Sequence, residues 1–378
     1  MRLMTIVGTR PELIRLSLVF GALHRAGIEN VLVHTGQNYD PLLSDVFFTE
    51  LDLPEPDLYM GIREERAGAQ IGQIVARSEA AMLEHAPDAL LILGDTNSGL
   101  SAIAATRLGI PIFHMEAGNR CFDPSVPEER NRRLIDHISD WLLPYTTRSR
   151  EHLVDEGIER TRIFVSGNPI TDVLEHFRPR WEASDVLERL ELDAASYVLV
   201  TAHRQETVDV PRRLIALCHG LNAIASELAR PLVWSVHPRT RVRLEGLDLP
   251  LHPAIQLREP FGFFDFMALQ SGAACVVTDS GTVQEECSLL HVPVVTCRDS
   301  TERPETVECG SNVLSGVEDP DRLVACVNLV LGRDCDWVSP YAHDRAVAMR
   351  ITNYLFNAPP AAASQRLSSV SAGGAHAG

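Results

Sequence analysis

Short apolar runs, each followed by a polar cluster and then by a longer amphipathic stretch, recur through most of the chain. The apolar runs have the length of buried strands, and the amphipathic stretches have the spacing of helices. In the first half we predict strands at 4–7, 30–34, 89–93, 111–114, 141–144 and 162–165. We predict helices over 11–24, 68–85, 98–108 and 149–156, and one more that is opened by Pro127. Strands that alternate with helices predict a parallel, doubly wound α/β sheet.

The same pattern restarts in the second half, with predicted strands at 197–201, 231–236, 274–278 and 292–297. The charged, helix-prone segment 171–193 is the expected connection between two Rossmann-like halves. We therefore expect a first domain over 1–172 and a second over 173–342, which suits a chain of 378 residues. Residues 343–358 are expected to form a helix that packs back on the first domain. The Pro-, Ala-, Ser- and Gly-rich stretch 359–378 is expected to be a disordered tail.

Polar clusters follow nearly every predicted strand in both halves. In open α/β sheets, ligands bind outside the carboxyl ends of the strands. The clusters therefore predict one ligand-binding cleft between two facing domains.

Two glutamates give the first domain its candidate chemistry. Glu116 ends an apolar run and is followed by Gly118, Asn119 and Arg120, whereas Glu128 opens a helix shortly after. Acids delivered from a strand end and a nearby helix start can converge on one substrate, as acid/base catalysis requires. The alternative is a polar turn and an ordinary acidic helix start, which the helix dipole also favours.

Arginines at the first strand–helix junction suit an anionic ligand. Arg10 lies where the first strand meets its helix and is a natural diphosphate contact. Arg15 follows on the same helix, where it could equally be a surface residue.

The second domain offers a better-defined binding site. Asp279, Ser280 and Gly281 end a strand and open a helix, whose N–H groups can hold a diphosphate. A carboxylate about one turn into that helix can accept both hydroxyls of a ribose. Phe266 could stack on a base or simply belong to the core, and Ser280 could be only a helix cap.

Two histidines each follow a strand of the second domain directly. His203 and His237 could serve as phosphate ligands or proton donors, or could be structural histidines with satisfied hydrogen bonds.

Composition excludes several classes of protein. A net charge of −17 argues against general nucleic-acid binding. No stretch approaches the length of a membrane helix, and the chain enters a strand directly instead of a signal peptide, so we expect a cytoplasmic protein. The eight cysteines form no CxxC pair, which favours free thiols over disulfides or a zinc site. No GxGxxG follows the first strand, which argues against a nicotinamide dinucleotide.

All 34 basic residues are arginine, because the sequence contains no lysine. Schiff-base chemistry, pyridoxal phosphate attachment and a P-loop lysine are therefore excluded. A phosphate would have to be held by arginine, histidine, hydroxyl and backbone N–H groups.

Taken together, the motifs resemble those of the non-hydrolysing UDP-N-acetylglucosamine 2-epimerase family over about residues 3–316. The matching motifs are GTRPE (8–12), GDT (94–96), EAG-R (116–120), PEE-NR (127–132), AHR (202–204), HP (237–238), DSG--QEE (279–286) and TERPE (301–305). The resemblance implies a GT-B fold. It also implies inversion at C2 of a UDP-2-acetamido sugar, by anti elimination of UDP to a 2-acetamidoglycal and re-addition.

The resemblance also assigns roles to single residues. It implies Asp95, Glu116 and Glu128 as the acid/base set, with His203 assisting at the leaving diphosphate. The implied UDP-binding residues are Arg10, Arg15, His237, Phe266 at the uracil, Ser280, Gly281, Glu286 and Arg303. No cofactor and no metal are implied. The expected partners are the UDP-sugar and a second copy of the chain in a homodimer, with no nucleic acid and no membrane.

Details resemble one subgroup, the UDP-N-acetyl-L-fucosamine synthases, which serve bacterial surface polysaccharides such as capsule and O-antigen. The signs are HTGQNYD (34–40), HMEAGNRCFD (114–123), HPRTR (237–241) and PFGFFDF (260–266). They imply UDP-2-acetamido-2,6-dideoxy-L-talose as substrate, with UDP-N-acetylglucosamine/UDP-N-acetylmannosamine epimerisation as the alternative. A GT-B glycosyltransferase and a non-catalytic UDP-sugar-binding protein are alternatives of another class.

Three positions depart from the wider family. Arg15 replaces a common lysine, and Asn119 stands where leucine is usual, which supports the subgroup. Gln37-Asn38 replaces the Gln-His pair with which many relatives bind an activating second substrate molecule, so we expect no such activation.

Overall fold

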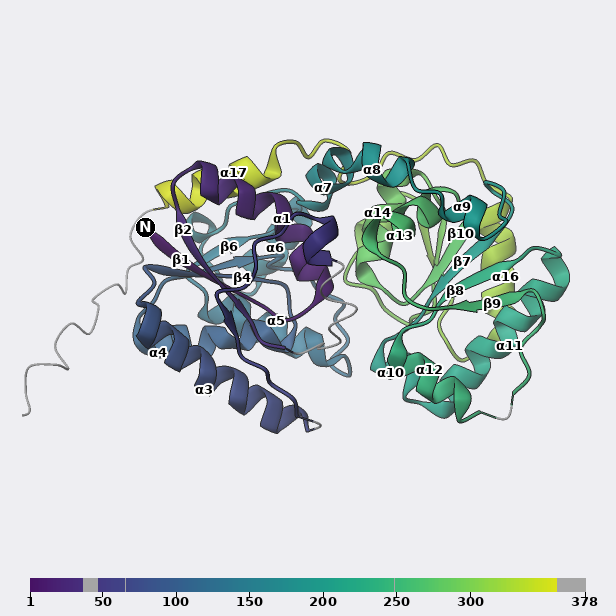
Figure 1. The fold of residues 1–378 in the computed structure, drawn as a ribbon, viewed down its shortest axis with the longest axis horizontal. Coiled ribbons are helices and arrows are strands. Elements are labelled where there is room, and N and C mark those ends of the chain that lie inside the picture. The colour runs from purple at the N-terminus through teal and green to yellow at the C-terminus, as the bar shows by residue number, and fades with distance from the viewer. Residues whose placement is uncertain (37–46, 65, 248, 359–378) are drawn as a thin grey trace, which may run out of the picture. The chain divides into compact units, whose positions relative to one another are not determined.

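The computed structural model describes residues 1–36, 47–64, 66–247 and 249–358, and divides the chain into two compact units. The first unit comprises Met1–Asn119, Pro124–Pro169 and the chain from Arg345 onward; the second comprises Arg120–Asp123 and Ile170–Asp344. Each unit contains one six-stranded sheet in its described residues (Figure 1). The chain thus leaves the first unit after Pro169 and returns to it at Arg345.

The sheet of the first unit has the strand order β3-β2-β1-β4-β5-β6. All its paired strands are parallel. Its strands are β1 (Arg2–Val7), β2 (Glu29–His34), β3 (Leu58–Tyr59), β4 (Ala89–Leu93), β5 (Ile112–Met115) and β6 (Trp141–Leu143). The helical elements are α1 (Arg10–Arg25), α3 (Ala67–His85), η1 (Asn97–Ser101), α4 (Ala102–Leu108), α5 (Pro127–Ile138), α6 (Thr147–Asp155), η2 (Arg160–Arg162) and α17 (Val347–Asn357).

The sheet of the second unit repeats this topology, with the order β12-β11-β10-β7-β8-β9 and parallel pairing. Its strands are β7 (Val198–Thr201), β8 (Leu232–Ser235), β9 (Ile255–Arg258), β10 (Cys275–Thr278), β11 (Val294–Thr296) and β12 (Asn312–Leu314). The helices are α7 (Ile170–His176), α8 (Arg178–Glu182), α9 (Val186–Arg189), α10 (Gln205–Val208), α11 (Pro211–Leu228), α12 (Pro238–Glu245), α13 (Phe263–Ser271), α14 (Gly281–Leu290), α15 (Pro304–Glu308) and α16 (Pro320–Leu331).

Helices cover both faces of the second sheet, and the alternation of side chains along β7 explains how. Val198 and Val200 pack in a cluster with residues of α11 and α16, whereas Leu199 packs in a separate cluster with residues of α13 and α14. Strands buried on both faces read as continuous apolar runs, because neither face needs polar side chains. The continuous apolar run that follows Tyr197 agrees with this burial of β7 on both faces.

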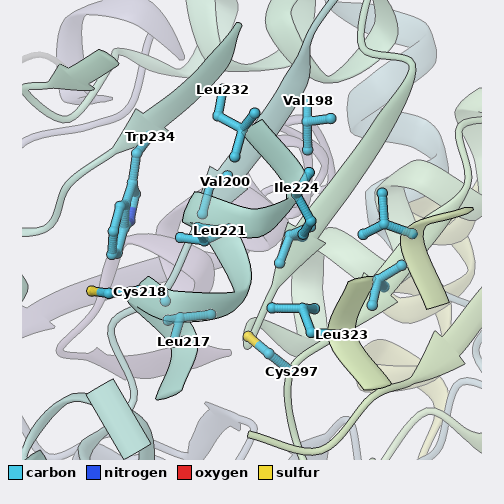
Figure 2. Close-up of a cluster of buried hydrophobic side chains, with 14 of the residues drawn as sticks. Val198, Val200, Leu217, Cys218, Leu221, Ile224, Leu232, Trp234, Cys297 and Leu323 are labelled. Atoms are coloured by element: carbon cyan, nitrogen blue, oxygen red, sulfur yellow. The ribbon is translucent and has the colours of Figure 1, made fainter. Parts of the chain in front are cut away.

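The larger of these clusters shows how α11 fits its sheet (Figure 2). Leu217, Leu221 and Ile224 of α11 follow a helical spacing of four and three residues, so they lie on one face of the helix. They meet Val198 and Trp234 from the neighbouring strands β7 and β8. Burial of side chains of this kind typically contributes about 1.5–3 kcal/mol each. This packing fixes α11 against β7 and β8.

The strands expected from the sequence are present, with one correction. Residues 162–165 form no strand; Ile163 only makes an isolated bridge to Leu142. The expected helix over 98–108 begins as the 3₁₀ turn η1 and continues as α4, and segment 171–193 forms α7, α8 and α9 within the second unit. The short strands β3, β9 and β12 were not predicted. The expected tail 359–378 lies outside the described residues.

Helix α17 returns to the first unit and lies against α1 (Figure 1). Tyr354 stacks on Phe164 with ring centroids 4.4 Å apart, and Arg350 donates a hydrogen bond of 2.8 Å to the carbonyl of Val165. Within the described ranges, no helix has the length and apolar character needed to cross a membrane.

Candidate functional site

In the first unit, β1 and β4 are neighbours although β2 and β3 intervene in the chain, so the strand order reverses between them. Such a reversal is where α/β proteins bind ligands. Glu12 of α1 spans this point: Oε2 accepts the N–H groups of Gly8 and Thr9, at 3.0 and 2.7 Å. Its Oε1 accepts the hydroxyls of Thr96 and Ser98, at 3.2 and 2.6 Å. Burial raises the pKa of the Glu12 carboxyl group. This side chain ties the loop after β1 to the turn after β4.

Arg10 is the first residue of α1 and directly follows Gly8 and Thr9, the two residues that Glu12 holds. Thr9 and Glu12 form a capping box, and Pro11 suits the first helical turn, so the local sequence dictates where the helix begins. The Arg10 guanidinium lies over the ring of Phe47, 5.3 Å from its centroid.

Glu116 follows β5 and has an unusual backbone. Its φ is +64°, in the left-handed region that few residues other than glycine adopt. Backbone strain of this kind costs on the order of 1–3 kcal/mol and is concentrated at functional sites. The Glu116 carboxylate forms a buried ion pair with Arg15, and Arg15 also lies over the ring of Tyr145. The Glu116 carboxylate also lies close to Gly94, the residue before Asp95. One of its oxygens is 3.9 Å from the position that a Cβ on Gly94 would occupy.

Asp95 lies at the end of the turn after β4, and α5 holds it there. Arg132 of α5 donates to the Asp95 carboxylate through Nε at 2.9 Å and also through Nη2. Asn131 donates to the Asp95 carbonyl at 3.0 Å. Glu128 opens the same helix, one turn before these two side chains. The sheet edge and α5 therefore bring the segments of all three predicted acids together.

In the second unit the strand order reverses between β10 and β7, and Asp279 lies there with no exposed surface. Its carboxylate accepts the backbone N–H groups of His203 and Arg204, each at 2.9 Å. His203 is thereby fixed beside the strand end, and its side chain remains 40% exposed. The ring of His237, which follows β8, lies 5.8 Å from the His203 ring. The structure therefore brings both predicted histidines to one edge.

Ser280 precedes α14, but its hydroxyl does not cap that helix. A Cβ on Gly281 would come 2.6 Å from Glu302 Oε1, so glycine is required for Glu302 to reach the start of α14. Arg204 donates to the same Glu302 oxygen at 3.2 Å. The start of α14 thus presents a hydroxyl group and helix N–H groups beside arginine side chains, a combination that suits a diphosphate.

The remaining predicted binding residues lie near α14. Gln270 donates to Glu286 at 2.8 Å, which holds that carboxylate one turn into the helix. Arg303 forms an ion pair with the fully buried Glu285. Phe266 packs partly buried against the core cluster that contains Val283.

Sequence reasoning assigned no role to Glu12, Arg132, His114 or Asp136. One signal could have found two of them: Glu129, Arg132 and Asp136 recur at helical spacing on one face of α5, and all three are buried.

Gln37-Asn38 and Tyr39-Asp40, expected to replace an effector site, lie outside the described residues. The part of the chain that the structure describes contains no group of three or more metal-ligating side chains.

Two Rossmann-like units, each with polar side chains gathered at the carboxyl edge of its sheet, define a GT-B protein. The family model of UDP-N-acetylglucosamine 2-epimerase matches residues 22–355, and the chain belongs to this family. It is an epimerase of the UDP-N-acetylglucosamine 2-epimerase type.

Relatives support this assignment over almost the whole chain. The UDP-N-acetylglucosamine 2-epimerase of Methanocaldococcus jannaschii is 38% identical, with 92% of this chain and 96% of the relative covered. The UDP-2,3-diacetamido-2,3-dideoxy-D-glucuronate 2-epimerase of Pseudomonas aeruginosa is 36% identical, with 94% and 99% covered. A crystal structure of the M. jannaschii enzyme in complex with UDP-GlcNAc and UDP matches with a TM-score of 0.90 at 37% identity, covering 94% of this chain and 99% of that one.

Proposed function

We propose that the protein is a non-hydrolysing 2-epimerase, with the first unit supplying the acid/base groups and the second binding UDP. The observation that carries the proposal is the gathering of Asp95, Glu116 and the start of α5 with Glu128 around one sheet edge. A glycosyltransferase or a UDP-sugar-binding protein has no evident need for three acids there.

In the proposed reaction, a carboxylate removes the C2 proton while the C1–O bond to UDP breaks on the opposite face. The electron pair of the C2–H bond forms the C1=C2 double bond of a 2-acetamidoglycal, and UDP takes the bonding electrons of C1–O. A second acid then protonates C2 from the other face, where the electron pair of the double bond forms the new C2–H bond, and a UDP oxygen attacks the cationic C1 that this leaves. Because C2 is approached from both faces, the reaction needs at least two acid/base groups.

UDP would be held by the start of α14 in the second unit. The Ser280 hydroxyl is not used as a helix cap, and the N–H groups of a helix start favour an anion. Glu286 would accept the ribose hydroxyls, Phe266 would contact the uracil, and Gly281, His237 and Arg303 complete the proposed set. His203, with its backbone fixed by Asp279, would assist the leaving diphosphate. In the first unit, Arg10 would contact the diphosphate, and Arg15 would act through its ion pair with Glu116.

For the sugar, we propose UDP-2-acetamido-2,6-dideoxy-L-talose, converted to UDP-N-acetyl-L-fucosamine for a bacterial surface polysaccharide. The proposal rests on the subgroup motifs. Asn119, which belongs to the motif HMEAGNRCFD, lies beside α6 and accepts a hydrogen bond of 2.9 Å from the Ser149 hydroxyl. The leucine that is usual in the family could not accept this bond.

Incubation of the pure protein with single UDP-sugars and no acceptor, in D₂O, tests the proposal. We expect deuterium at C2 and an equilibrium mixture of two epimers, fastest with the 6-deoxy-L-sugar. Release of free sugar would contradict the non-hydrolysing mechanism. Faster turnover of UDP-N-acetylglucosamine would contradict the choice of sugar but leave the reaction intact. The same protein should sediment as a homodimer.

A further inference from the structure

His114 of β5 and Asp136 of α5 form a hydrogen-bonded pair in which neither side chain has any exposed surface. His114 Nδ1 lies 2.8 Å from Asp136 Oδ1, and Nε2 lies 2.9 Å from the carbonyl oxygen of Gly94. The second oxygen of Asp136 accepts the N–H of Gly118 at 3.2 Å. Every polar atom of the two side chains is therefore used inside the protein.

The partners of His114 determine how many protons the pair holds. A carbonyl oxygen can only accept, so Nε2 must carry a hydrogen toward Gly94. A neutral imidazole has only one N–H, so the contact between Nδ1 and Asp136 needs a second proton, on either atom. The pair as a whole is then neutral, as its buried place requires, since a lone buried charge is costly.

These bonds join the three segments that carry the proposed acids. Gly94 directly precedes Asp95, Gly118 follows Glu116 by two residues, and Asp136 lies on the helix that Glu128 opens. Gly94, Glu116 and Gly118 all have positive φ, at +74°, +64° and +77°. For Glu116 this backbone conformation is unfavourable by itself, so contacts outside the turn must maintain it.

Gly118 shows how tightly the second of these turns is enclosed. A Cβ at this position would come 2.1 Å from the carbonyl oxygen of Ser149 in α6. His152 Nδ1 lies 3.0 Å from the Gly118 carbonyl oxygen. The turn after Glu116 is therefore held from α5 through Asp136 and from α6 through His152.

We propose that His114 and Asp136 are positioning residues of the epimerisation, which fix Asp95, Glu116 and Glu128 relative to one another without touching the substrate. The inference rests on the proposed acid/base roles of those three residues. Displacement of a catalytic group by about 1 Å can lower a rate by about 10²-fold, so the pair should affect turnover far more than binding.

Three variants test this role. In Asp136→Asn, the amide can donate to Nδ1 and accept from Gly118, so all the bonds persist with a neutral imidazole. In Asp136→Ala, both bonds are lost. Asp140→Ala is the matched control, because Asp140 accepts the N–H of Ile112 at 2.9 Å, at the start of the same strand and away from the acids.

We expect Asp136→Ala to lower kcat by about 10²-fold with KM and the Kd for UDP little changed. Asp136→Asn should keep most of kcat, and Asp140→Ala should lose stability without losing turnover. If Asp136→Ala does not fold, His114→Gln provides the comparison, because a single amide group cannot reach both Asp136 and Gly94.

Three results would overturn the inference: near-normal kcat in a folded Asp136→Ala or His114→Gln protein, equal loss of kcat in Asp140→Ala, or loss in Asp136→Asn as large as in Asp136→Ala. The activity of the wild type distinguishes a failure of the positioning role from a failure of the proposed function. If the wild type does not epimerise its UDP-sugars, the proposed function fails. If it does, but Asp136→Ala and Asp140→Ala have the same kcat, only the positioning role fails.

Discussion

The two units share one strand order but use the reversal of that order differently. In each, one buried carboxylate holds the neighbouring strand ends together: Glu12 in the first unit and Asp279 in the second, both accepting backbone N–H groups. Around Glu12 the first unit gathers further carboxylates, paired with Arg15 and Arg132. Around Asp279 the second unit presents histidines, a hydroxyl and a helix start.

The difference shows that topology decides where a site lies and side chains decide what it does. A single buried carboxylate is a structural device common to both edges, whereas the additional groups distinguish the edge that is proposed to transfer protons from the edge that is proposed to bind UDP. Substitutions should therefore separate the two units by the quantity that they change.

The largest effect is expected from Glu116→Gln in the first unit. The substitution keeps the shape of the side chain but removes proton exchange, so kcat should fall by roughly 10²-fold or more. UDP affinity should change little, because Glu116 is not among the residues that are proposed to bind UDP. Rate measurements and calorimetry check both parts, with Glu151→Gln, an exposed carboxylate of the same unit, as the control. Normal turnover would remove Glu116 from the acid/base set.

Ser280→Ala and Glu286→Ala in the second unit should act on binding. Loss of a hydrogen bond to a charged group costs about 1.5–3 kcal/mol, so the Kd for UDP should rise roughly tenfold to 100-fold in each variant. Calorimetry measures this, and Glu318→Ala, a surface carboxylate of the same unit, should leave the Kd unchanged. Unchanged Kd values in both test variants would place UDP elsewhere.

An effect that is absent at neutral pH and appears only in acid is expected from His34 in the first unit. Burial lowers the pKa of His34 to about 4, and Nδ1 accepts the N–H of Gly36 at 3.0 Å. The unfolded chain binds a proton below about pH 6.5 while the folded protein does not, so stability should fall by about 1.4 kcal/mol per pH unit between about 6.5 and 4.

Urea unfolding at several pH values should show a shallower dependence for His34→Gln than for the wild type. His219→Gln removes an exposed histidine of the second unit and is the control. If the unfolding free energy depends on pH in the same way in the wild type and in His34→Gln, the lowered pKa of His34 is refuted.

The smallest effect is expected away from both carboxyl edges. Arg2 forms an ion pair with Glu29 at 2.8 Å, but the two side chains are 43% and 59% exposed. Such surface pairs contribute about 0–1 kcal/mol, so Arg2→Ala should barely change the unfolding free energy. A loss above about 2 kcal/mol in urea unfolding would show that this edge is more tightly held than its exposure indicates.

Much of the fold follows from apolar runs in the sequence. β4 is predicted residue for residue, because all five of its side chains are buried and apolar. β3 has only two residues and β12 only three, and such short strands exist through their pairing with neighbours. The exposed and polar positions of β9 likewise give no apolar run.

The candidate site could be proposed from the sequence as a set of residue types, but its contacts could not. Glu116 could be proposed from its place after a strand, whereas its ion pair with Arg15 joins residues 101 positions apart. The positive φ of Glu116 has no local sequence signal either, since glutamate does not favour that conformation. Contacts of this kind arise only when the strands are assembled.

The return of α17 to the first unit has a consequence for synthesis of the protein. Domains generally fold as units, and the N-terminal one usually folds first as the chain emerges from the ribosome. Here Tyr354 and Arg350, which pack against Phe164 and Val165, emerge only after the whole second unit has been translated. The second unit is nearly continuous in sequence and can fold during translation, whereas the first unit is completed last. Nascent chains halted before α17 would therefore carry a folded second unit and an unfinished first one.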